Sequence, residues 1–211
     1  MTEPTLLEVL HDGFVRLERW DDNGFTREVV RTTDSACGLL IDMTNRRVLL
    51  ISQSRVPMRR DDNPEGISIS TVAGRFDKDL GPKALLVDEA LAEAGVTITQ
   101  DDVQLLNMGV PMYLSSGVLT ERSFIAVALI HPKGIAHGDT GLGDKSEGED
   151  IDRVWVPINT LIHPDTMFSS MRTWALAQWL ARAELMTMIN ELRDHPWVWS
   201  GSPADLTGIS T

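Results

Sequence analysis

Cysteine, tyrosine and positive charge are all scarce in this sequence. Its 211 residues include one cysteine and one tyrosine, and 19 lysines and arginines stand against 31 aspartates and glutamates, for a net charge of −12. The lone Cys37 excludes a disulfide framework within one chain, and its apolar run ACGLLI favours a buried structural thiol. The acidic balance argues against nucleic acid as a partner, because phosphate backbones are bound by basic surfaces.

Long apolar runs are also missing. The sequence contains no stretch of about 18 apolar residues, which is the length that predicts a membrane span. It also shows no N-terminal apolar stretch with the pattern of a signal peptide. We therefore expect no membrane partner and a cytoplasmic location. The five histidines show no ligand spacing, so zinc is not expected.

The patterns that are present predict an α/β protein. Alternating segments in residues 1–35, with a turn at 21–24, predict a β-hairpin or meander that must pack on the main domain or on a second subunit. Further along, strands and helices are expected at 36–52, 67–72, 82–94 (helix), 103–108, 123–130, 153–157 and 170–194 (helix). The polar stretch 132–150 is long enough to be a functional loop or a disordered one.

The most informative stretch is 74–95, which reads GRFDKDLGPKALLVDEALAEAG. Glu89 and Glu93 are four residues apart, so a helix places them on one face, where like charges repel. A divalent cation would turn this repulsion into binding, because hard cations prefer carboxylate oxygens. The alternative is a solvated acidic helix face.

This stretch resembles the Nudix box, G-x5-E-x7-R-E-U-x-E-E-x-G-U, in which U is aliphatic. The positions in register are Gly74, Glu89, Ala90, Glu93, Gly95 and Val96. Three positions depart from the signature: Leu80 and Ala92 replace glutamates, and Asp88 replaces the arginine.

Three further segments are similar to one Nudix branch, the ADP-ribose and nucleoside-diphosphate-sugar pyrophosphatases. They are VLLISQSRVP at 48–57, YLSSGVLTE at 113–121 and EGEDID at 147–152. The resemblance implies a Nudix α/β/α sandwich with a mixed sheet and a small N-terminal antiparallel β appendage. It divides the chain into a dimerisation subdomain at 1–35 and a Nudix domain with a long C-terminal helix at 36–211, and it implies a homodimer.

The resemblance also implies a set of site residues. Mg²⁺, or alternatively Mn²⁺, would be held by Glu89, Glu93, Glu149 and the carbonyl of Ala73, and Glu147 would be the general base. Substrate contacts would come from Arg55, Ser116, Gly117 and Glu121. From the residues alone, Glu147 and Glu149 equally fit a disordered acidic loop. The alternative for Arg55 is a structural salt bridge, although an arginine at a strand end beside the site slightly favours a ligand contact.

The implied activity is Mg²⁺-dependent cleavage of the diphosphate in ADP-ribose or a nucleoside-diphosphate sugar. The products would be a nucleoside monophosphate and a sugar phosphate. A diphosphate carries clustered negative charge that metals must neutralise before a nucleophile approaches. If the general base is on a mobile loop, closure of that loop assembles the active site around bound substrate. Two alternatives are a catalytically impaired nucleotide-sugar binding module and a scaffold that acts on another phosphorylated metabolite.

Overall fold

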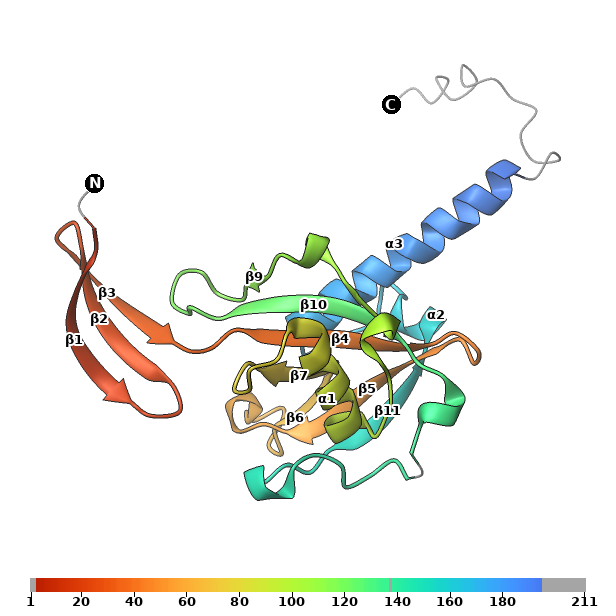
Figure 1. Ribbon diagram of the computed structural model, residues 1–211, viewed down its shortest axis with the longest axis horizontal. Coiled ribbons are helices and arrows are strands. Elements are labelled where there is room, and N and C mark those ends of the chain that lie inside the picture. The colour runs from red at the N-terminus through yellow and green to blue at the C-terminus, as the bar shows by residue number, and fades with distance from the viewer. Residues whose placement is uncertain (1–2, 137, 195–211) are drawn as a thin grey trace, which may run out of the picture.

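The computed structural model describes residues 3–136 and 138–194, and their side chains except at 132, 147 and 189–194. The helices are α1 (Pro82–Ala94), α2 (Ile158–Leu161) and α3 (Met171–Asp194). The strands are β1 (Thr5–Asp12), β2 (Arg16–Asp22), β3 (Phe25–Arg31), β4 (Ser35–Asp42), β5 (Arg47–Ser54), β6 (Ile67–Ser70), β7 (Val72–Arg75), β8 (Val103–Leu105), β9 (Met112–Tyr113), β10 (Arg122–Leu129) and β11 (Asp152–Pro157). Figure 1 shows a small sheet beside a larger body, with α3 extending away from that body.

The body is built on one mixed sheet. Its central order is β11-β5-β4-β10-β8, with β6 paired to β5, β7 to β4 and β9 to β10. The pair β4–β10 is parallel, and the other pairs are antiparallel. The expected α/β class with a mixed sheet is therefore confirmed.

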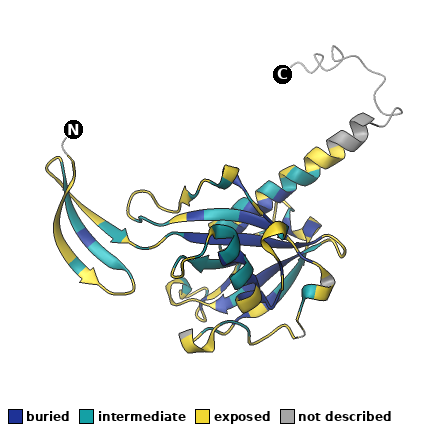
Figure 2. Ribbon diagram, viewed as in Figure 1, coloured by how far each residue is buried: buried dark blue, intermediate teal, exposed yellow. Residues whose placement is uncertain are grey.

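Strand β4 shows why the sheet is buried on both faces. All eight of its residues are buried, and alternate side chains point to opposite faces of a strand. Ala36 and Leu40 pack in one cluster with α1, while Leu39 and Ile41 pack in a second cluster with α2 and α3. A continuous apolar run is the pattern of a strand covered on both sides, and Figure 2 shows the central strands as buried.

Residues 67–72, expected as one strand, form parts of two. The chain changes partner at Thr71, because β6 pairs with β5 and β7 pairs with β4. Thr71 is buried, and its backbone N–H donates to Thr173 Oγ1 in α3 at 3.2 Å. This change of partner brings β7, which contains Gly74 of the box, alongside β4.

The first three strands form a sheet of their own in the order β1-β2-β3. This meander has one strand more than a hairpin. Phe14, in the β1–β2 loop, lies under the guanidinium of Arg75, which is 4.3 Å from the ring centroid. The division of the chain into domains at residue 35 stays a prediction.

Candidate active site

Glu89 and Glu93 lie on α1 where it faces β7. The helix begins with Pro82 at its first turn and ends at Gly95, whose φ of 59° is the left-handed conformation that glycine favours. An added Cβ at Gly74 would lie 2.0 Å from Glu89 Oε1. Glycine at this position therefore leaves the space that the Glu89 carboxylate fills.

Glu93 is the more buried of the two carboxylates, with 2% of its surface exposed. The backbone N–H of Ala73 donates to Glu93 Oε2 at 2.9 Å. No ion pair reaches Glu93 among the described residues. Burial raises the pKa of Glu93 to about 8, and burial followed by the charge of Asp88 raises the pKa of Glu89 to about 7.

At the end of the polar stretch, residues 142–151 form a hairpin next to α1. Leu142 and Ile151 exchange backbone hydrogen bonds, and Gly143 N–H donates to the carbonyl of Ala92 on α1 at 3.0 Å. At the tip of the hairpin, Asp144 N–H donates to Glu149 Oε2 at 3.0 Å. The negative charge of Glu149 raises the pKa of both α1 glutamates, so Glu149 faces the pair.

The expected metal shell is only partly assembled. In the part of the chain that the structure describes, no group of three or more His, Cys, Asp or Glu residues lies close enough to hold a metal ion. The carbonyl of Ala73 and the carboxylate of Glu149 therefore stay predicted ligands. The side chain of Glu147 lies outside the described residues, although its backbone is in the 3₁₀ turn at the hairpin tip.

Arg55 follows the end of β5 and is fixed from two sides. Its backbone N–H donates to the carbonyl of Gly66 at 2.8 Å. With the amide of Gln53 oriented to satisfy its neighbours, the Gln53 oxygen accepts hydrogen bonds from Arg55 Nε and Nη2. The positive charge of Arg55 lowers the pKa of Glu93, so Arg55 lies near Glu93. Sequence reasoning named Arg55 but missed Gln53, although Gln53 opens the Q-x-R pattern.

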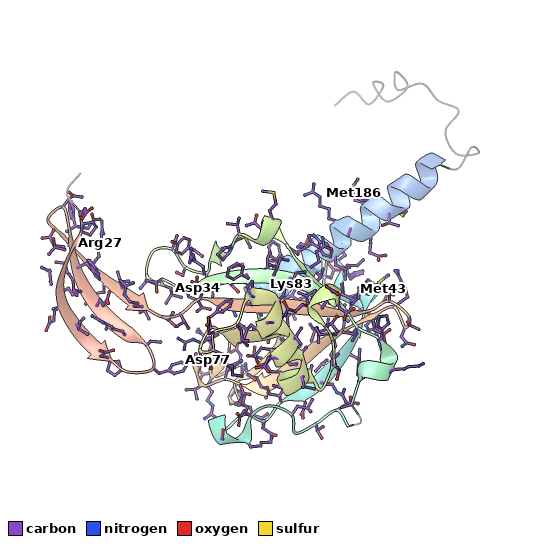
Figure 3. All side chains as sticks on the ribbon, in the orientation of Figure 1. Arg27, Asp34, Met43, Asp77, Lys83 and Met186 are labelled. Carbon is purple, nitrogen blue, oxygen red and sulfur yellow. The ribbon has the colours of Figure 1, made fainter. Side chains whose placement is uncertain are left out.

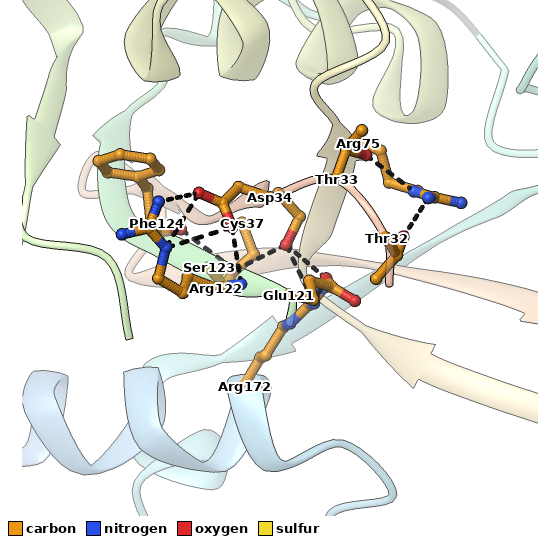
Figure 4. A network of polar contacts seen from close by, with 11 residues as sticks. Thr32, Thr33, Asp34, Cys37, Arg75, Glu121, Arg122, Ser123, Phe124 and Arg172 are labelled. Atoms are coloured by element: carbon orange, nitrogen blue, oxygen red, sulfur yellow. Dashed lines mark hydrogen bonds and ion pairs between the residues drawn. The ribbon is translucent and has the colours of Figure 1, made fainter. Parts of the chain in front are cut away.

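The other predicted substrate residues lie at a second place in the fold. Glu121 is engaged within the protein, because Arg172 of α3 donates to it at 2.6 Å and Ser35 at 2.7 Å. This network lies where β4 and β10 begin (Figure 4), and it also contains the Asp34–Arg122 ion pair of 2.6 Å. Arg172 could not be predicted as a partner of Glu121, because the two residues are 51 positions apart in the sequence.

Ser116 and Gly117 line a cavity of about 740 Å³ between β3 and the loop after β9. Charged side chains in its wall include Arg31, Asp34 and Arg122. Neither α1 glutamate is in this wall. The predicted substrate residues therefore lie apart: Arg55 is near Glu93, Ser116 and Gly117 line this cavity, and Glu121 is bonded to Ser35 and Arg172.

Comparison with known proteins identifies relatives. No family model matches the chain. A GDP-mannose pyrophosphatase from Yersinia enterocolitica is 33% identical over 147 residues, which cover 65% of this chain and 74% of the relative. One from Yersinia pestis is 32% identical over 65% of this chain and 71% of the relative, and one from an Enterobacter species is 32% identical over 62% and 63%. The chain belongs to the family of these GDP-mannose pyrophosphatases.

In this member of the GDP-mannose pyrophosphatase family, the side chains at two of the three departures from the box have structural partners. Leu80 packs against the core cluster that includes α1. Asp88 forms an ion pair of 2.6 Å with Lys78. At the third departure, the backbone carbonyl of Ala92 accepts the hydrogen bond from Gly143 that joins the acidic hairpin to α1. No helix in the described residues is long and apolar enough to cross a membrane.

Proposed function

We propose that this protein is a Mg²⁺-dependent Nudix pyrophosphohydrolase that cleaves the diphosphate of a nucleoside-diphosphate sugar. The observation that carries the proposal is a pair of carboxylates on α1, the half-buried Glu89 and the buried Glu93, neither of which forms an ion pair with any residue that the structure describes. Without a bound cation, keeping both carboxylates charged at this place destabilises the protein, and a bound cation offsets that free-energy cost. The names of the relatives favour a nucleotide sugar over ADP-ribose, and GDP-mannose is the first substrate to test.

The donors at this place suit Mg²⁺. Carboxylate oxygens are the ligands that this hard cation prefers, and Gly74 leaves room for the Glu89 carboxylate beside β7. We infer that Glu89 and Glu93 hold the ion, with Glu149 and the Ala73 carbonyl as further ligands and Mn²⁺ as a substitute. When bound, the ion neutralises charge on the diphosphate.

The remaining residues have roles in binding and proton transfer. Arg55, held by Gln53 and Gly66, binds a phosphate oxygen through its fixed guanidinium. Glu147, on the acidic hairpin, accepts a proton from the attacking water. Ser116 and Gly117 contact the part of the substrate that enters the cavity, and Glu121 supports that wall through its bonds to Ser35 and Arg172.

The second candidate is a nucleotide-sugar binding module without turnover. It is favoured by the structural use of Leu80 in the core and of Asp88 in an ion pair, at two of the three departures from the box. A third candidate, action on another phosphorylated metabolite, differs from the first only in its substrate.

The test is a turnover assay with GDP-mannose, other nucleoside-diphosphate sugars and ADP-ribose, each with and without Mg²⁺. We expect a nucleoside monophosphate and a sugar phosphate, formed only with the metal. If calorimetry shows that a nucleotide sugar binds, and no product forms with either Mg²⁺ or Mn²⁺, the result would contradict the hydrolase and favour the binding module.

We also propose a homodimer that forms through residues 1–35. The support is the exposure of this sheet: β1 is exposed at seven of its eight residues, and Leu7 and Phe25 are 55% and 65% exposed. Apolar side chains on an isolated three-stranded sheet gain from a covering surface. Light scattering of the full chain should give twice the monomer mass at micromolar concentration, and Leu7→Glu should reduce that mass.

A further inference from the structure

Helix α3 carries an exposed row of mostly apolar side chains at coiled-coil spacing. Successive members are three, four, three, four and three residues apart, and we name them the α3 seam: Met171, Trp174, Gln178, Ala181, Leu185 and Met188. Met171 is 79% exposed, and Trp174, Leu185 and Met188 are each about half exposed. A repeat that alternates three and four residues keeps one helix face turned toward a partner helix.

The fold uses a different face of α3. Leu176, Ala177 and Leu180 are buried in the cluster against β4, β5 and α2. Beyond these residues the helix projects from the body, and Figure 2 shows exposed and half-buried residues along this part. The α3 seam therefore lies outside the buried cluster that holds α3 on its own sheet.

Charge makes α3 a favourable place for two copies to meet. The whole chain has a net charge of −12, so copies of the body repel one another. Within α3, three arginines balance two glutamates and one aspartate, which leaves the helix neutral. A second copy can therefore approach along α3 at a smaller electrostatic cost than along a surface that carries the chain's excess negative charge.

We propose that the α3 seam pairs with the α3 seam of a second copy of this chain, in antiparallel orientation. In this register Trp174 lies opposite Leu185 of the second copy, and Met171 lies opposite Met188. Gln178 and Ala181 meet at the two-fold axis, where the small alanine allows close approach. A parallel pair would bring both acidic bodies to the same end of the helices, whereas the antiparallel pair separates them.

The contact area of the proposed helix pair is small. From Met171 to Met188 the helix is about 27 Å long, so the pair alone covers less than the roughly 800 Å² per partner of a standard interface. We therefore expect assembly to depend on concentration in the micromolar range. This contact is separate from the one proposed for residues 1–35. If both form, each with two-fold symmetry, four copies close into a tetramer.

Two methionines provide a matched test. Met188 belongs to the α3 seam, whereas Met186, labelled on the projecting part of α3 in Figure 3, lies on another side of the helix. They are 51% and 49% exposed, so neither substitution should unfold the monomer. By light scattering, Met188→Glu should halve the mass of the parent assembly, and Met186→Glu should leave it unchanged. A monomeric parent at about 100 µM, or equal masses for both variants, overturns the proposal.

Cysteine cross-linking tests the orientation. The natural Cys37 is buried, so Gln178→Cys and Ala181→Cys each introduce the one accessible thiol. In the antiparallel pair, a disulfide should form between the two variants when they are mixed and oxidised. Disulfides within each variant alone, with none between the two, would overturn the antiparallel register. No disulfide in any mixture would overturn the contact itself. Neither test uses the α1 carboxylates, so failure here leaves the proposed hydrolase intact.

Discussion

Glu18 and Glu93 each have 2% of their surface exposed, yet they have opposite surroundings. Glu18, in the N-terminal sheet, accepts two hydrogen bonds of 2.9 Å from Arg31 and one of 2.8 Å from Trp20. The hydrogen bond with Arg31 holds the pKa of Glu18 below its ordinary value. Glu93 has one backbone donor and a like-charged neighbour, and burial raises its pKa to about 8.

The difference separates a structural carboxylate from one suited to binding. A buried ion that is fully paired contributes to the fold and has no bonding capacity left for a ligand. A buried carboxylate without a cation holds its charge at a cost, and a bound cation offsets that cost. Burial alone would not have distinguished the two residues, because their exposed fractions are the same.

The largest expected effect comes from removing the α1 charges. Glu93→Gln and Glu89→Gln should each lower Mg²⁺-dependent turnover by about 10³-fold or more, because metal stabilisation of the transition state is worth several kcal/mol. The fold should persist, since each change removes one charge from a repelling pair. Steady-state kinetics and circular dichroism measure the two outcomes.

Glu18→Gln is the matched control for this comparison. It should leave turnover per folded molecule within about threefold, because Glu18 is in the other sheet. It should lower the melting temperature, because Arg16 and Arg31 would lose their buried partner. A collapse of turnover in Glu18→Gln with an unchanged melting temperature would show that the comparison is wrong.

The next effect concerns the proposed general base. Glu147→Gln should lower turnover by about 10²-fold with little change in substrate affinity. Asp144 is a poor control, because its side chain accepts from Ser146 N–H at 2.7 Å and shapes the hairpin tip. Asp150→Asn is better, since the Asp150 side chain is 84% exposed and pairs with the exposed Lys145. Equal losses in both variants would mean that the hairpin acts only through its total charge.

Local sequence patterns predicted the helix α1 and the buried strands well. The proline at the start of α1, the glycine at its end and the apolar run of β4 each act within a few residues. The box register placed Glu89 and Glu93 together, because four residues on a helix fix their separation. Such features need no knowledge of distant parts of the chain.

Contacts between distant residues could not be predicted in this way. The change of strand partner at Thr71 depends on Thr173, which is 102 residues away. Glu121 matched a motif, but its bonds to Ser35 and Arg172 depend on how β4, β10 and α3 pack. The low exposure of Glu18 could not be predicted from the sequence either, because it depends on the neighbouring strands of its sheet.

A smaller effect is expected in stability as a function of pH. The pKa of Glu93 is about 8 in the folded protein and 4.5 ordinarily, so the folded state binds more protons across this window. Without metal, stability should therefore fall as pH rises from about 5 to 8, by on the order of 5 °C in melting temperature. Glu18, with its lowered pKa, acts in the opposite direction, and its stabilisation is lost as pH falls below about 4.5.

Melting curves from pH 4 to 9 separate these two contributions. Glu93→Gln should reduce the decrease in melting temperature between pH 5 and 8, and Asp150→Asn should show the same decrease as the parent. Mg²⁺ should stabilise the parent most at the high end of the window, where the carboxylates are ionised. A parent whose melting temperature is constant from pH 5 to 8 would show that the pair is hydrated rather than buried.

The smallest expected effect comes from Asp88, the residue at the arginine position of the box. Its side chain pairs with Lys78 on the surface, and both side chains are about half exposed, so the pair should contribute little to stability. Removing the charge should still lower the pKa of Glu89, because Asp88 is the largest charge that raises it. We therefore expect Asp88→Asn to bind Mg²⁺ slightly more tightly near pH 6, by about twofold. Above pH 8 it should match the parent, because Glu89 is ionised in both proteins. Metal titrations at the two pH values measure this ratio, and a large loss of Mg²⁺ affinity at both would place Asp88 among the ligands.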